Sequence, residues 1–383
     1  MTRARCLGAA SAMALLAAPA LALPETVESG GLTLTVETVA APLEHPWGMA
    51  VLPDGSVLVT ERNAGTIRRV PAGGELSEPL VTLGDLFRYE GETGRSQAGL
   101  FDILLHPDFE ENGLVYWSYS RETERGAAVV VQRAEWDGEG FGEAEDVWVM
   151  QEADQDSSGL HFGGRMAWGL DGSLYLSIGE RRNIERAQDL EDQAGSVLRM
   201  TDAGEAPEDN PSWDEDANEF LFTAGNRNIQ ALTVHPSTGE VWAVDHGPQG
   251  GDEINLLVGG NNYGWPWTTG GVDYSGAPIG VGPTMEGMTP PVHIFEETVA
   301  PSGLTFVWNE PAFEAWQGDM LVGGLQTGGI VRVTLEEGRV AAEEVIALDR
   351  RVRDVAVADG AIWVITDHED GELVRLVPGG SDS

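Results

Sequence analysis

One pattern of hydrophobic and polar positions recurs along the chain. It consists of an apolar strand, a turn of the Pro-Asp-Gly or His-Pro type, and a second strand rich in β-branched and aromatic residues. Spacing between copies is about 50 to 75 residues, longer than a minimal four-stranded blade, so inserted loops are expected. Six copies can be counted, as in WGMAVLPDGSVLVTE and GRMAWGLDGSLYLSIGE; they begin at Trp47, Gly99, Gly164, Ile229, Gly303 and Val352.

The segments that follow these hairpins predict additional, outer strands. Clear examples are GTIRRV, AVVVQRAEW, GGIVRVTLEEG and GELVRLV. The chain is therefore predicted to be all-β, a six-bladed β-propeller of four-stranded antiparallel sheets. An early strand at residues 32–37 is expected to join the last blade and close the ring. A Greek-key sandwich is the competing all-β fold, but it does not explain six similar hairpins.

The N-terminus has the pattern of a secretory signal peptide. Arg3 and Arg5 precede a short apolar run, and Ala20-Leu21-Ala22 resembles a small-residue cleavage site. We expect residues 1–22 to be removed and residues 23–383 to form a single catalytic propeller domain, periplasmic or secreted. Cys6, the only cysteine, would leave with the signal.

The charge of the chain is strongly negative. Its 22 basic residues, all arginine, face 63 acidic ones, for a formal net charge of −41. Such an acidic surface disfavours a nucleic-acid partner or an anionic membrane surface, and nothing after the signal resembles a membrane span. A solvated acidic surface that keeps the protein soluble is sufficient to explain the negative charge.

Two histidines remain as candidates for chemistry once the positions of the others in the repeat and their sequence neighbours are considered. His45, His106 and His235 precede proline in turns, and His293 and His368 have no chemical neighbours of note, which leaves His161 and His246. His161 lies in SSGLHFGGRM, directly before an inner strand. Long irregular stretches at residues 84–98, 151–162, 180–219 and 247–300 are expected to meet at one end of the central channel, where a site would form.

Arginines recur at the start of inner strands, at Arg165, Arg227, Arg351 and Arg353. Unless each pairs with one of the abundant acids, together they predict a positive patch for a polyanionic ligand, because guanidinium groups bind carboxylates in pairs. In the Gly-rich loop HGPQGGDE, backbone groups can approach a ligand closely. Asp252 and Glu253 come next and could provide oxygen ligands for a hard cation. A hairpin with a long surface loop would explain the same residues without a cation.

These motifs resemble a known family. HFGGRMAWGLDGSLYLSIGE, GNRNIQALTVHP, HGPQGGDEINLLVGGNNYGWP and RVRDVAVADG, in this order over nearly the whole chain, resemble the soluble aldose sugar dehydrogenases that use pyrroloquinoline quinone (PQQ), the glucose/sorbosone dehydrogenase family. The resemblance implies oxidation of the C1 hydroxyl of aldoses to lactones by hydride transfer to PQQ, with electrons passed to an external acceptor. The protein would act as a monomer or homodimer.

The resemblance also implies roles for particular residues. His161 would be the general base and Arg227 would stabilise the charge that develops on the quinone oxygen, with Asn228 beside it. Main-chain carbonyls of two loop residues would bind a Ca²⁺ that also ligates the cofactor, and two further residues would hold a second Ca²⁺. The implied cofactor contacts are Gln97, Arg227, Asn228, Arg351 and Arg353, and the implied metal ligands are Gly247, Pro248, Glu253 and Tyr263.

Three departures from the family pattern concern cofactor affinity. Gln326 stands where the family commonly has a lysine that contacts the cofactor, Gln249 replaces a frequent arginine, and the loop around Arg227 reads Gly-Asn-Arg-Asn-Ile-Gln. Two other functions remain open for such a propeller. One is a calcium-dependent lactonase or esterase, and the other is a binding propeller without catalytic activity.

Overall fold

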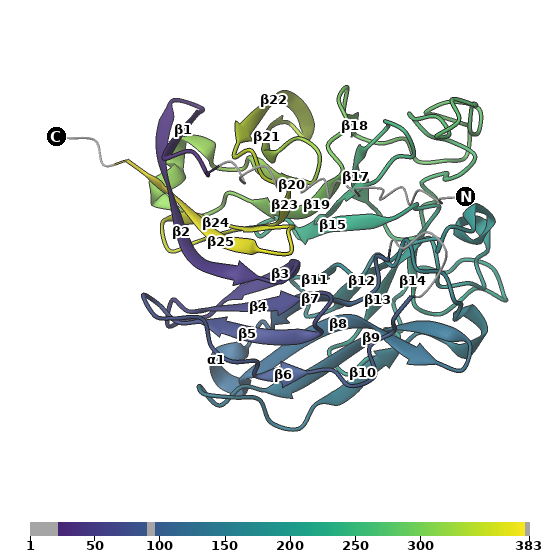
Figure 1. The fold of residues 1–383 in the computed structure, drawn as a ribbon. Coiled ribbons are helices and arrows are strands. Elements are labelled where there is room, and N and C mark those ends of the chain that lie inside the picture. The colour runs from purple at the N-terminus through teal and green to yellow at the C-terminus, as the bar shows by residue number, and fades with distance from the viewer. Residues whose placement is uncertain (1–21, 90–95, 380–383) are drawn as a thin grey trace, which may run out of the picture.

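A computed structural model describes residues 22–89 and 96–379 and forms a six-bladed β-propeller (Figure 1). The expected signal sequence lies almost wholly outside the described residues. Each of the first three blades is a four-stranded antiparallel sheet. Their strands are β3 (Pro46–Val51), β4 (Val57–Glu61), β5 (Thr66–Val70) and β6 (Val81–Thr82); β7 (Leu100–Leu105), β8 (Leu114–Thr123), β9 (Gly126–Glu135) and β10 (Glu145–Val149); and β11 (Met166–Trp168), β12 (Leu174–Ile178), β13 (Ser196–Met200) and β14 (Leu221–Ala224).

The second half of the ring repeats this arrangement. Its strands are β15 (Ile229–Val234), β16 (Val241–Asp245), β17 (Glu253–Leu257) and β18 (His293–Ile294); β19 (Pro301–Phe306), β20 (Met320–Gly324), β21 (Gly329–Glu336) and β22 (Arg339–Ala347); and β23 (Val352–Ala358), β24 (Ala361–Thr366) and β25 (Gly371–Pro378). The described helices are short segments between strands: α1 (Phe109–Asn112), η1 (Glu152–Asp154), η2 (Ile184–Gln188) and η3 (Pro311–Trp316).

The predicted hairpins are confirmed, and their turn chemistry is visible in the structure. In the first blade, Gly55 has a positive φ of 76°, which an L-residue adopts only at a cost. The Asp54 carboxylate accepts the backbone N–H of Ser56 at 2.9 Å. The third blade repeats this turn with Gly172 at φ 80° and a bond from Ser173 N–H to Asp171 at 3.0 Å.

The last blade is closed by the N-terminal strand, as predicted. Strand β2 (Leu32–Leu43) pairs antiparallel with β25, and β1 (Thr26–Ser29) pairs with β2, so this sheet has five strands. Figure 1 shows the purple β2 running beside the yellow β25. The two ends of the described chain are therefore tied together, and no blade is left open at the start of the ring.

Two of the stretches expected to be irregular contain strands. The segment at residues 180–219 includes β13, and the segment at 247–300 includes β17 and β18. The prediction of irregular structure was wrong there because these outer strands lie between long inserted loops and lack the repeat's turn signature.

Buried hydroxyl groups join four of the six blades to the blade that follows. Every one donates to a main-chain carbonyl on the first strand of the following blade, or just before it. The bonds are Thr60 Oγ1 to Phe101 O at 2.6 Å, Ser118 Oγ to Gly164 O at 2.5 Å, Ser177 Oγ to Ile229 O at 2.9 Å and Ser302 Oγ to Val352 O at 2.6 Å.

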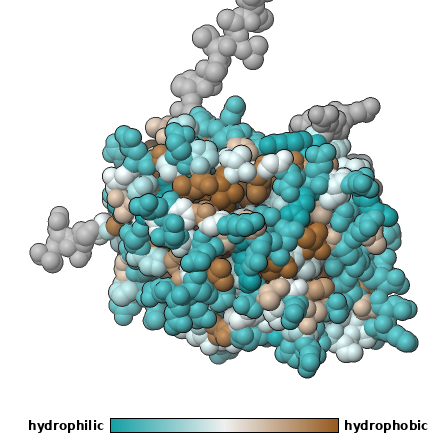
Figure 2. Space-filling model, turned by 90° about the horizontal axis from the view of Figure 1, so that it is seen from below, coloured by the Kyte–Doolittle hydropathy of each residue, from teal (hydrophilic) through white to brown (hydrophobic). Residues whose placement is uncertain are grey.

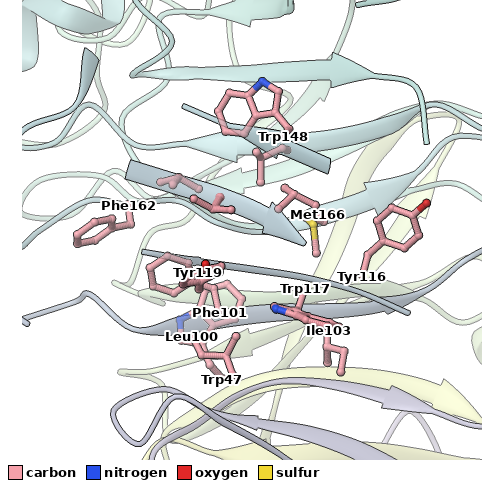
Figure 3. Packing of buried hydrophobic residues seen from close by; sticks show 14 of the residues in the cluster. Trp47, Leu100, Phe101, Ile103, Tyr116, Trp117, Tyr119, Trp148, Phe162 and Met166 are labelled. Atoms are coloured by element: carbon pink, nitrogen blue, oxygen red, sulfur yellow. The ribbon is translucent and has the colours of Figure 1, made fainter. Parts of the chain in front are cut away.

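Aromatic side chains fill the spaces between blades (Figure 3). The rings of Trp47 and Phe101 lie 5.5 Å apart, and those of Phe101 and Phe162 also lie 5.5 Å apart. All three residues are buried and come from different blades or their leading loops. This packing fixes the segment around Phe162, which carries the neighbouring His161.

Candidate active site

A cavity of about 610 Å³ opens among the loops at one end of the propeller. Its lining comes from the first, fourth, fifth and sixth blades and from the segments that lead into the second and third. The lining residues are His45, Trp47, Arg62, Gln97, His161, Arg227, Asn228, Gln230, His246, Gly247, Pro248, Gln249, Gly250, Asp252, Tyr274, Thr298, Ala300, Leu325, Gln326, Arg351, Arg353 and Asp367. Every cofactor contact implied by the sequence is in this set, as are Gly247 and Pro248.

His161 is held by a carboxylate that the sequence analysis did not identify. Its Nδ1 lies 2.5 Å from Oε2 of Glu180, whose side chain is only 1% exposed. Burial lowers the pKa of His161, while the bond to Glu180 raises it and Arg227 lowers it. The imidazole is therefore neutral near pH 7. Because Glu180 accepts the Nδ1 proton, Nε2 carries the lone pair that a general base needs.

The main chain around His161 is fixed by two other cavity residues. His161 has φ 51°, and its N–H donates to Oε1 of Gln97 at 2.7 Å. The N–H of Gly163 donates to Oδ1 of Asn228 at 3.1 Å. Gln97 and Asn228 thus position the histidine, in addition to any contact that they make with a ligand.

Arg227 enters the cavity from the loop before β15. Its N–H and that of Asn228 both donate to the Asp245 carboxylate, each at 2.7 Å. The guanidinium donates through Nη1 to the carbonyl of His246 at 3.2 Å, while its buried Nε has no hydrogen-bond partner among the described residues. Arg227 therefore lines the cavity and retains unused donor capacity.

Arg351 and Arg353 share one carboxylate. Each donates to Oδ2 of Asp367 at 2.8 Å. Burial raises the pKa of Asp367, but Arg353, His45 and the other arginines lower it far more, so the carboxylate stays charged. Burial lowers the pKa of Arg353 to about 10, which is still high enough for a full positive charge at neutral pH.

Arg165 does not belong to this patch. Its guanidinium is buried beneath the cavity, 2.9 Å from Asp102 and 3.1 Å from Asp354. It also donates to the carbonyls of Gln230 and Ser302, at 3.0 and 2.9 Å. Arg165 therefore links blades across the ring, and the expectation that all four strand-start arginines face one ligand fails for this residue.

The Gly-rich loop is held in place by Asp252. One carboxylate oxygen accepts the N–H of Gly247 at 2.9 Å, and the other accepts those of Val299 and Ala300 at 2.8 Å. Three backbone donors occupy this carboxylate, so Asp252 shapes the loop and is not a free cation ligand. Gly247 and Pro248 line the cavity beside it.

Glu253 and Tyr263 lie behind the loop. Glu253 borders a small adjoining void, and burial together with the nearby Asp245 raises its pKa to about 8. The Tyr263 hydroxyl donates to Leu256 O at 2.6 Å and accepts the N–H of Val258 at 2.9 Å. Its carbonyl, which accepts the Thr268 hydroxyl at 3.4 Å, is the oxygen that could also meet a cation. Within residues 22–89 and 96–379, no group of three or more His, Cys, Asp or Glu side chains is arranged to hold a metal.

The acids that hold His161, Arg227, Arg351 and Arg353 share a position in the sequence repeat. Glu180, Asp245 and Asp367 each come at, or within two residues of, the end of the second strand of a repeat. Glu61 occupies a similar position at the end of β4. Aligning the repeats at the glycine of each hairpin turn places these acids within two positions of one another, whereas a comparison of the strand starts, where the arginines lie, does not reveal them.

Fold and site together define a class of protein: a β-propeller whose open end holds a carboxylate-oriented histidine base among several arginines. Comparison with known families assigns the chain within that class. The glucose/sorbosone dehydrogenase model matches residues 43–375, and the chain belongs to this family.

Individual relatives agree with the assignment. The chain is 33% identical over 374 residues to the aldose sugar dehydrogenase YliI of Escherichia coli, covering 94% of this chain and 97% of that protein. The crystal structure of the soluble aldose sugar dehydrogenase from Escherichia coli in the apo form superimposes with a TM-score of 0.83, at 32% identity over 90% of this chain and all of the other. The PQQ-bound aldose sugar dehydrogenase from Streptomyces coelicolor gives a TM-score of 0.72, at 25% identity over 90% of this chain and 98% of the other.

Proposed function

We propose that the protein is a quinoprotein that oxidises the C1 hydroxyl of aldose sugars to lactones and passes the electrons to an external acceptor. The observation that carries this proposal is the pairing of a neutral, Glu180-oriented His161 with an arginine-lined cavity in a member of this family. One group supplies a base for a sugar hydroxyl, and the other supplies a site for a polycarboxylate cofactor.

The cavity lining fits PQQ, which carries three carboxylates. Four arginines and two aspartates line it, although the whole chain has 63 acidic and only 22 basic residues. Buried Nε atoms of Arg227 and Arg353 have no hydrogen-bond partner among the described residues. Unpaired buried donors are costly, and carboxylate oxygens would satisfy them.

In the proposed mechanism, His161 removes a proton while Arg227 and Asn228 stabilise negative charge. When bound, the ortho-quinone of PQQ would accept the hydride from C1 of the sugar. His161 Nε2 takes the proton of the anomeric hydroxyl, and Glu180 stabilises the resulting imidazolium through Nδ1–H. Arg227 donates hydrogen bonds where charge increases, and its backbone bond to Asp245 fixes its position.

Calcium dependence is part of the proposal. The main-chain carbonyls of Gly247 and Pro248 offer the hard oxygen ligands that Ca²⁺ prefers, on a loop already fixed by Asp252. Arg351, Arg353 and Gln97 would hold the rest of the cofactor. Glu253 and the carbonyl of Tyr263 are proposed for a second, structural Ca²⁺.

We also propose that the protein is exported after loss of residues 1–22, and that residues 23–383 act as a single catalytic domain. The N-terminal pattern supports export. No helix in residues 22–89 or 96–379 is long and apolar enough to cross a membrane.

Reconstitution tests the proposal. The mature protein is purified without cofactor, loaded with PQQ with and without Ca²⁺, and assayed for dye reduction with a panel of aldoses. Sugar-dependent reduction that requires both additions is the expected result. Lactone hydrolysis by protein without quinone would instead favour a lactonase, and no reduction with any sugar would favour a binding propeller.

A His161→Gln variant assigns the base. We expect its dye reduction to fall by about 10²- to 10⁴-fold, because general-base catalysis is lost. PQQ binding, followed by quenching of tryptophan fluorescence, should stay within about twofold of the original protein, since the arginines that bind carboxylates are unchanged. A fully active variant would exclude His161 as the base.

A further inference from the structure

Arg62 is a cation at the cavity that the family resemblance did not assign. It follows β4 of the first blade and lines the cavity. Its Nε donates to Oδ1 of the neighbouring Asn63 at 3.1 Å, and none of the ion pairs formed between described residues includes it. A half-buried guanidinium with no carboxylate in direct contact retains donors for a negatively charged ligand.

The stem of Arg62 is built into the blade junction. Gly99, at φ +149°, allows the close approach, because a Cβ there would lie 2.4 Å from Cγ of Arg62. The N–H of Arg62 donates to His45 O at 3.1 Å, and its carbonyl accepts the N–H of Leu100 at 3.0 Å. The backbone therefore fixes where the guanidinium begins, so its presence at the cavity does not depend on a mobile surface chain.

Arg62 adds to an excess of positive charge in one wall of the cavity. Arg351 and Arg353 share Asp367, which leaves that trio with one net positive charge, and Arg62 adds a second. Burial lowers the pKa of Arg62, Asp367 raises it, Arg351 lowers it, and Glu44, which does not line the cavity, raises it, so these groups are close enough to interact. A ligand with at least two negative charges would neutralise this wall.

We propose that Arg62 binds a carboxylate of the PQQ cofactor and supplies the cation that is absent at Gln326. This inference rests on the proposed function. Gln326 also lines the cavity, next to Leu325, whose carbonyl accepts a bond from Arg351 at 3.0 Å. The additional positive charge is thus provided from the first blade, in the same cavity as Gln326, where the family commonly has lysine.

The test is a binding titration of the apo protein with PQQ in the presence of Ca²⁺, followed by quenching of tryptophan fluorescence. Arg62→Gln should weaken binding by about ten- to a hundredfold, the loss expected for one charge-assisted hydrogen bond. Arg62→Lys retains the charge without the guanidinium fork, so its affinity for PQQ should lie between those of the original protein and Arg62→Gln. The matched control is Arg375→Gln, which removes an arginine that pairs with Glu37 in the last blade and does not line the cavity.

Two further measurements separate a ligand-binding role from a structural one. The melting temperature of the apo Arg62→Gln variant should equal or exceed that of the original protein, because no direct ion pair is lost and a half-buried charge is removed. The double variant Arg62→Gln/Gln326→Lys should regain affinity, because it returns a cation to the same cavity.

The possible outcomes distinguish this inference from the proposed function. If the original protein binds PQQ and Arg62→Gln binds it equally well, the role of Arg62 is wrong and the proposed function stands. A lower apo melting temperature in Arg62→Gln would also overturn the inference, since it would mark a structural role. If the original protein binds no PQQ, both the proposed function and the role of Arg62 are wrong.

Discussion

The Glu180–His161 pair illustrates what individual residues contribute to this site. A histidine beside a glycine pair is an ordinary sequence feature, and its chemistry follows from the partner at Nδ1. Burial alone would lower the pKa of His161 and make it a weak base, and Glu180 opposes that effect. The pair therefore provides a base that is unprotonated near neutrality and that gains stabilisation when it accepts a proton.

A Glu180→Gln substitution should affect both the rate and its pH dependence. We expect kcat to fall by roughly 10²- to 10⁴-fold, because the imidazolium loses its counterion and the tautomer is no longer fixed. Glu180 raises the pKa of His161, so the remaining activity should be lost at a lower pH than in the original protein as the pH falls. Profiles of dye reduction by the reconstituted enzyme measure both effects.

Glu191→Gln is the control for this prediction, because Glu191 is an exposed acid eleven residues further along the same segment. An unchanged rate and an unchanged acid limb in Glu180→Gln would show that the carboxylate only packs against the histidine. A rate loss with an unchanged acid limb would also contradict the proposed electrostatic role.

The positions of some single residues of the site could not be predicted from the sequence. Arg165 and Arg227 both stand at the start of an inner strand, yet one lies under the cavity between Asp102 and Asp354, and the other lines the cavity. The strand-start pattern does not separate them, because the difference depends on which groups of neighbouring blades each guanidinium meets. Arg62 was missed for a similar reason, since it follows a second strand.

At the scale of elements, the sequence was most informative where turn chemistry repeats. The hairpins around Asp54-Gly55 and Asp171-Gly172 were readable because a turn with positive φ needs glycine and an aspartate that caps it. Strands β13 and β17 were missed. Strand β13 follows a long insertion and β17 precedes one, and neither is preceded by a turn with the repeat's sequence pattern.

The closing strand gives a prediction at this scale. Leu34 of β2 is fully buried, lies opposite Val27 of β1 and Pro378 of β25, and packs in the core of the last blade. Leu34→Ala should lower the free energy of unfolding by about 2–5 kcal/mol, through lost burial and the cavity left behind. Urea denaturation of the apo protein measures the change.

Thr35→Ala, at the next and exposed position of β2, is the matched control and should cost less than about 1 kcal/mol. Equal small effects of both substitutions would show that β2 contributes little to closing the ring. The prediction does not depend on the proposed enzymatic activity, because it concerns folding alone.

At the scale of the whole molecule, two electrostatic fields of opposite sign act on anything that approaches. The net charge of −41 makes the long-range field negative, while four arginines make the cavity lining positive. One face of the molecule is covered mostly by hydrophilic residues, with separated hydrophobic patches (Figure 2). Salt screens long-range interactions first, since the Debye length falls from about 30 Å at 0.01 M to about 8 Å at 0.15 M.

The charge of the electron acceptor should therefore decide how its reduction rate depends on salt. If the long-range field governs encounter, the reconstituted enzyme should reduce a cationic dye about tenfold or more faster at 0.01 M than at 0.15 M ionic strength. An anionic acceptor such as ferricyanide should show the opposite slope, and an uncharged dye should show little change. Second-order rate constants at saturating sugar provide the comparison.

The opposite result would have a definite physical meaning. An anionic acceptor that slows as salt is added would show that the arginines at the cavity, and not the acidic surface, attract the acceptor. Substituting Arg351, whose side chain is 47% exposed, by Gln should then reduce that salt dependence, because the most accessible of the four positive charges is lost. A slope of the same sign for cationic and anionic acceptors would show that neither field controls the encounter.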